Sequence, residues 1–142
     1  RFCGSKFGRS SLCHCRMCQK AFGSPFALLV TVHDLEWTRG APTHFQSSNK
    51  VRRGFCADCG TPLTFDYGQS VEIAVCAFDD PNVAAPTIQV NPESKQPFFD
   101  DMFSLPTRAE GAEPKAETFK ASIVSFQPPD RDTAEWPPKG AR

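Results

Sequence analysis

The chain has 142 residues and no net charge, which suits one domain of ordinary size with a modest core. It contains no run of about 18 apolar residues, so we expect a soluble protein without a membrane partner. Residues 1–60 carry nine Lys and Arg against three Asp and Glu, which could attract an anionic small molecule or nucleic acid, or form an ordinary solvated surface.

Short β-rich runs separated by turn residues follow one another from residue 26 onward. They predict a mainly β fold of antiparallel strands, with no helical period competing. In the last run we expect Cys76 to be a buried core thiol. The runs lie at residues 26–32, 35–38, 43–46, 51–55, 62–67 and 71–76.

The composition changes at Pro81, because ten of the thirteen prolines lie from there onward. Proline disfavours long helices and central strands, so we expect loops, with one late strand at 121–126. The sequence therefore predicts a domain over residues 1–126 and an extended, proline-rich tail over residues 127–142.

Three of the seven cysteines lie in the segment Cys13-His14-Cys15-Arg16-Met17-Cys18. Residues i and i+2 of an extended segment face the same side, and the next three residues can curl back, so three thiolates can meet one zinc ion. Three protein ligands with a fourth position open are typical of catalytic zinc. Cysteines this close suit metal better than disulfides, which favours a reducing, cytoplasmic location.

A second cysteine pair, Cys56-Ala57-Asp58-Cys59 followed by Gly60, is typical of structural zinc. If the triplet holds its own ion, this pair needs a partner, and Cys3 is the obvious third ligand. Two zinc sites are then expected. The alternative is one closed site made of Cys15, Cys18, Cys56 and Cys59, with Cys13 incidental. His14 would point away from the shared face, so we expect it to support the ligands or to face the substrate rather than to bind the metal.

Residues 12–26 and 53–63 together closely resemble the glutathione-dependent formaldehyde-activating enzyme family, also called the CENP-V/GFA domain. The resemblance implies an Mss4-like fold of stacked antiparallel sheets pinned by zinc knuckles. It implies that the triplet binds the catalytic zinc and that Cys56 and Cys59 form half of a structural site. The family's other half is C-x-C-G, matched here by residues 1–4 with Arg1 in place of the first cysteine, which leaves that zinc one ligand short.

The activity implied by the resemblance is that of a carbon–sulfur lyase, which joins glutathione to formaldehyde as S-hydroxymethylglutathione or splits that adduct. Its partners would be a small thiol and an aldehyde. Arg16, Lys20, Arg52 and Arg53 are the candidates to bind glutathione carboxylates. One alternative is a related reaction of another small thiol or electrophile. The other is a non-catalytic, zinc-stabilised module that binds a protein or nucleic acid, although no basic tail or stripe favours nucleic acid.

Overall fold

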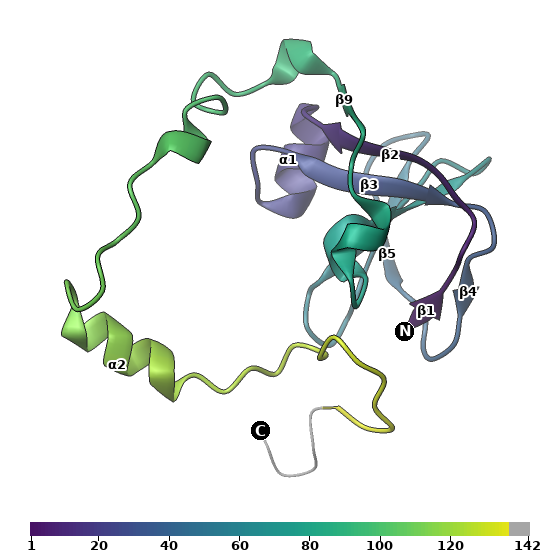
Figure 1. Ribbon diagram of the computed structural model, residues 1–142. Helices are drawn as coiled ribbons and strands as arrows, with labels where there is room; N and C mark the ends of the chain where they lie inside the picture. The colour runs from purple at the N-terminus through teal and green to yellow at the C-terminus, as the bar shows by residue number, and fades with distance from the viewer. Residues whose placement is uncertain (137–142) are drawn as a thin grey trace. The chain divides into compact units, whose positions relative to one another are not determined.

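The computed structural model describes residues 1–136, which divide into two compact units, the first spanning Arg1–Gln96 and the second beginning at Pro97. The first unit contains a seven-stranded sheet in the order β5-β6-β7-β8-β3-β2-β9, together with a two-stranded sheet of β1 and β4 (Figure 1). The strands are β1 Phe2–Cys3, β2 Phe7–Cys13, β3 Ala27–Val32, β4 Glu36–Trp37, β5 Thr43–Gln46, β6 Arg52–Phe55, β7 Pro62–Asp66, β8 Val71–Ala74 and β9 Ile88–Val90.

The mainly β prediction is confirmed. Six of the predicted runs contain the strands β3 to β8, and every pair in the two sheets is antiparallel except β2 with β9. In that parallel pair Ser11 lies opposite Ile88 and Cys13 opposite Val90. A parallel pair requires a long connection between its strands, so β9 returns to the sheet far along the chain from β2.

The large sheet is packed on both faces at β3, because successive side chains of a strand point to opposite sides. Val30 and Val32 pack with Ile73 of β8 in one core cluster. Ala27 and Leu29 pack in a second cluster that contains Cys13 and Cys18. The cysteine triplet therefore lies on one defined face of the sheet, which we call the cysteine face.

A short helix, α1 Arg16–Phe22, follows β2 and was missed by the sequence analysis. Cys15 caps its first turn, because its Sγ accepts a hydrogen bond from the Cys18 N–H at 3.4 Å. Gly23 ends it with φ 58°, a left-handed conformation in which its N–H bonds to the Gln19 carbonyl. Seven residues are too few to show a helical period, which explains the omission.

Two further predictions about elements were wrong. The strand expected at 71–76 ends at Ala74, and Cys76 lies exposed in a 3₁₀ turn, Val75–Ala77, rather than in the core. No strand forms at 121–126, where the chain leaves a helix, α2 Pro114–Ser122, and continues without regular structure. Proline at the first position of α2 needs no hydrogen-bond partner there, so it starts the helix instead of preventing it.

In the second unit, α2 buries none of its residues. The domain boundary expected at residue 126 falls inside this unit, and the expected tail, 127–142, extends past the described residues from 137 onward. Neither helix of residues 1–136 is long and apolar enough to cross a membrane.

Asp34 connects the turn after β3 to the segment between β1 and β2. Its carboxylate accepts hydrogen bonds from the backbone N–H of Ser5 and Lys6, at 2.9 Å each, and from the Ser5 hydroxyl at 2.7 Å. These bonds, the Lys6 N–H first among them, lower the pKa of Asp34 to about 2. The charged carboxylate is the form that the folded state stabilises.

We therefore expect Asp34→Asn to be less stable than the unchanged protein at neutral pH. The folded-state pKa is below the unfolded value near 3.8, so the contribution is complete above 3.8 and is lost as the pH falls toward about 2. Urea unfolding of both proteins between pH 7 and pH 2.5 measures this. A stability difference that stayed constant below pH 4 would contradict the assignment.

Candidate metal centre

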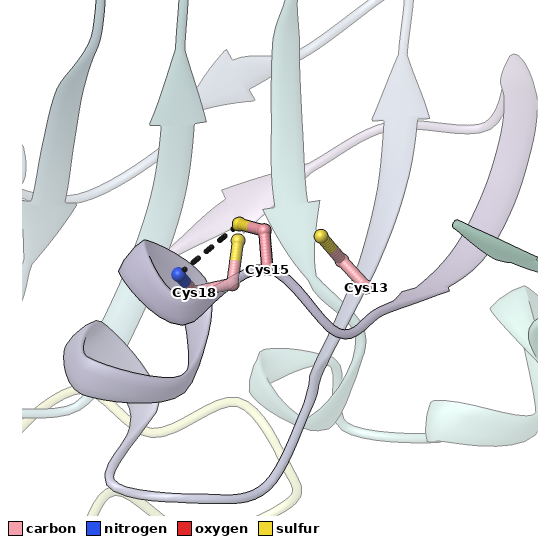
Figure 2. Close-up of side chains that lie close together, drawn as sticks. All are labelled: Cys13, Cys15 and Cys18. Carbon is pink, nitrogen blue, oxygen red and sulfur yellow. Dashed lines mark hydrogen bonds between the residues drawn. The ribbon is translucent and has the colours of Figure 1, made fainter. Parts of the chain in front are cut away.

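The end of β2 and the start of α1 bring Cys13, Cys15 and Cys18 together. Their three sulfur atoms all lie within 4.8 Å of one another, and the side chains point toward a common space (Figure 2). Cys13 and Cys18 are buried, and Cys15 is half-buried. In residues 1–136 this is the only cluster of three or more His, Cys, Asp or Glu ligand atoms this close together.

The triplet fits a zinc ion. Sulfurs at tetrahedral positions about 2.3 Å from zinc lie about 3.8 Å apart, which is compatible with three sulfurs that all lie within 4.8 Å of one another. Three thiolates are a soft donor set of the kind that zinc prefers. The group comes from one six-residue segment held by a strand and a capped helix, so little chain has to move to form the site.

Within the triplet, the pKa values of Cys13 and Cys18 are shifted in opposite directions. A hydrogen bond from the Cys13 thiol lowers the pKa of Cys18 to about 5; burial opposes this change, and Arg53 assists it. The same hydrogen bond and burial raise the pKa of Cys13 above its usual range. The lowered pKa favours the thiolate form of Cys18, which is the form that binds a metal ion.

Arg53 of β6 is the cation beside this thiolate. Its Nη2 donates to the Cys18 Sγ at 3.5 Å, and its guanidinium lies 5.0 Å from the centre of the Phe65 ring. The residue is 8% exposed, and its Nε and Nη1 have no hydrogen-bond acceptor in residues 1–136. A buried guanidinium with unused donors is costly, so these donors favour an anion or a polar oxygen beside them.

Glu72 of β8 lies in the same row of the sheet. Strand register pairs Arg53 with Phe65 and Phe65 with Glu72, so the three side chains share the cysteine face. Arg9 approaches the Glu72 carboxylate at 3.3 Å. Burial raises the pKa of Glu72, the Arg9 charge opposes this, and the Cys18 thiolate raises it further. A carboxyl group able to exchange a proton is therefore within electrostatic reach of the triplet.

The segment after β9 holds the triplet loop in place. Gln19 is 2% exposed, and its Nε2 donates to the His14 carbonyl at 2.6 Å and to the Ser94 carbonyl at 2.9 Å. The fully buried His14 has its Nε2 2.8 Å from Oε1 of Gln89, and the Cys13 Sγ lies 3.5 Å from Oδ1 of Asn91. His14 therefore lies outside the ligand group and fixes the loop.

The four basic residues expected at the site are not brought together. Arg53 alone among them has a recorded contact with the triplet. Arg52 is exposed on the opposite face, with its Nε 2.6 Å from Oδ2 of Asp66. Arg16 and Lys20 are exposed on α1, where Arg16 donates to Oε1 of Gln19 at 3.0 Å.

The family model of the glutathione-dependent formaldehyde-activating enzyme matches residues 3–94, a span that contains the triplet, Arg53 and the second cysteine pair. The chain belongs to this family. Searches of curated proteins and of solved structures found no significant match.

In this family member the second cysteine pair is separate from the triplet. Cys56 and Cys59 flank the turn between β6 and β7, where the Gly60 N–H bonds to the Cys56 carbonyl at 2.8 Å and Gly60 has φ 76°. Cys3 lies exposed in β1 and pairs with Glu36 of β4. In residues 1–136 no ligand group gathers these three sulfurs, and none joins Cys56 and Cys59 to the triplet. The second zinc site stays a prediction.

The role of Gln19 in this family member can be tested with Gln19→Met, which keeps the length of the side chain. The buried carbonyl group of His14 and the half-buried carbonyl group of Ser94 would lose their donor, at a cost of about 1 to 3 kcal/mol in the free energy of unfolding. Urea unfolding measures the loss. Gln46→Met is the matched control, because Gln46 also donates to a backbone carbonyl, at 2.6 Å, but is exposed, so water replaces it. Equal losses would show that Gln19 has no special role.

Proposed function

We propose that this protein is a zinc-dependent carbon–sulfur lyase, which forms or splits the adduct of a small thiol, such as glutathione, and an aldehyde. The observation that carries the proposal is the gathering of three cysteine sulfurs within 4.8 Å, in a chain that belongs to a family of formaldehyde-activating enzymes. Three ligands leave a fourth position for an exchangeable group, which is the arrangement that catalysis needs.

The residues of the cysteine face would have different roles in this reaction. Cys13, Cys15 and Cys18 would hold the ion, which supplies, when bound, a Lewis acid that lowers the pKa of a thiol and polarises a carbonyl. Arg53 provides positive charge and unused N–H donors for an oxygen on which negative charge develops. Glu72 can accept and return a proton, since its raised pKa brings its titration closer to neutral pH.

The test is adduct formation from glutathione and formaldehyde, followed by exchange NMR with zinc-loaded protein and compared with the uncatalysed background. We expect acceleration in both directions, since a catalyst leaves the equilibrium unchanged. Other small thiols are then substituted for glutathione. A rate equal to background for every thiol, together with tight binding of a protein or nucleic acid, would replace the enzyme proposal with that of a binding module.

We also propose that the protein takes up two zinc ions, with unequal affinities. The triplet is already assembled, whereas Cys56 and Cys59 must recruit Cys3 or another ligand, which costs ordering free energy. We expect metal analysis to approach two zinc ions per chain and a competing chelator to remove one first. Cys59→Ser should lose that ion only. One ion per chain, lost in Cys59→Ser, would contradict this proposal.

A further inference from the structure

A pocket of about 240 Å³ lies in the first unit, and Arg53, which contacts Cys18 of the triplet, is part of its lining. Its wall includes Ala21 and Phe22 from α1, Phe45 from β5, Arg53 and Phe55 from β6, and Pro62 from β7. Phe45 lies opposite Arg53 in the strand register, and Phe55 follows two residues later, so these side chains share the cysteine face. We call this space the Phe45 pocket.

Arg53 connects the Phe45 pocket to the metal ligands, because it lines the pocket and also donates to the Cys18 sulfur at 3.5 Å. Ala21 and Phe22 belong to the same short helix as Cys18. A small molecule that reacts at the triplet can therefore place a side group in the Phe45 pocket, on the same face of the sheet.

The lining indicates what kind of group fits. Three phenylalanines, a proline and an alanine give an apolar wall, and Phe45 is 65% exposed, an aromatic surface that a bound group would cover. A closed cavity of about 150 Å³ with such a lining binds benzene, so this volume suits one ring or a branched alkyl chain. It is below the roughly 300 to 1,000 Å³ of sites for larger ligands.

We propose that the Phe45 pocket binds the apolar side group of an aldehyde, so that the enzyme acts on arylalkyl or branched-alkyl aldehydes in preference to aldehydes that lack such a group. This inference rests on the proposed function and names its electrophile. The aldehyde oxygen would accept from the unused donors of Arg53, which supplies the acceptor that the guanidinium lacks.

The reaction balances without a further reagent. The thiol sulfur bonds to the carbonyl carbon, the π electron pair of the carbonyl moves to its oxygen, and the thiol proton ends on that oxygen. The product is a hemithioacetal, and nothing is oxidised or reduced. Splitting the adduct is the same step in reverse.

The first test is binding without chemistry, using 3-phenylpropan-1-ol, which has the side group but no carbonyl. In the zinc-loaded protein we expect it to shift the amide NMR signals of Gly54 and Gly60, which line the pocket, and not that of Gly8. Ala21→Phe, which fills the pocket from an exposed position of α1, should weaken binding about 10-fold or more. Ala85→Phe makes the same change at an exposed alanine outside the lining and should leave binding unchanged.

The second test compares aldehydes with glutathione as the thiol. We expect kcat/KM for 3-phenylpropanal to exceed that for acetaldehyde about 10-fold or more after correction for background, and Ala21→Phe to abolish this preference while formaldehyde still reacts. Retained zinc and an unchanged circular dichroism spectrum confirm that Ala21→Phe folds.

The outcomes separate the two proposals. If formaldehyde is accelerated but the alcohol does not bind, or binds equally to Ala21→Phe, the pocket inference is wrong and the proposed function stands. If the alcohol binds and Ala21→Phe weakens it, but no aldehyde reacts above background, the proposed function is wrong and the pocket remains as a site for an apolar group.

Discussion

Cys15→Ser should abolish adduct formation while leaving the protein folded. A hydroxyl is a far weaker zinc ligand than a thiolate. Losing a residue that only supports a ligand lowers zinc affinity by about 10- to 100-fold, so losing the Cys15 thiolate itself should lower zinc affinity at the triplet by more. The helix should survive, because serine is among the preferred residues at the position where Cys15 caps α1. Metal analysis, circular dichroism and the glutathione–formaldehyde assay measure the three effects.

Cys76→Ser is the matched control, since Cys76 is exposed in a 3₁₀ turn and belongs to no ligand group in residues 1–136. It should keep both zinc and activity. Full activity in Cys15→Ser with zinc still bound would show that the triplet is not the reaction centre.

Arg53→Met should lower the rate of adduct formation by about 100-fold, the usual effect of removing one donor that stabilises a developing oxyanion. Zinc affinity should also weaken, because three thiolates around one Zn²⁺ carry a net negative charge, which Arg53 offsets from 3.5 Å at Cys18. In cobalt-substituted protein the sulfur-to-metal absorption band should shift, which reports on the ligand sulfur independently of activity.

Arg52→Met is the control one residue away, where the side chain lies on the opposite face and bonds to Asp66. It should change neither the absorption band nor the rate, although it removes the same charge. Arg53→Lys should recover little of the rate that Arg53→Met loses, since an ammonium group does not reproduce the contact of the guanidinium with the Phe65 ring. Equal effects of Arg52→Met and Arg53→Met would show that Arg53 acts only through its charge and not through its contact with Cys18.

The strands and the triplet were predictable because their signals are local. Short β-rich runs bounded by turn residues marked β3 to β8, and a C-x-C-x-x-C segment can gather its own sulfurs without help from distant residues. The same reasoning failed where the determining contact is distant. Nothing in the residues around Gln19 indicates that its side chain will meet the Ser94 carbonyl.

The basic candidates show the same limit. Arg52 and Arg53 are adjacent and chemically identical, so composition assigns them one role. Strand alternation sends them to opposite faces, and only the register with Phe65 and Asp66 decides which one faces the cysteine triplet. Cys76 was misplaced because the apolar run 71–76 continues past Ala74, where the backbone leaves the strand and turns.

The parallel strand β9 and the residues after it complete the contacts of the triplet loop late in the chain. His14 and Gln19 depend on Gln89 and Ser94, each 75 residues further along the chain, so the three thiols are synthesised long before the segment that holds them. During translation the nascent triplet carries reactive sulfurs on an unsupported loop, open to oxidation and to adventitious metals. A chain that ended before residue 88 would therefore contain all three cysteines but lack the contacts from β9 and the segment after it that hold their loop.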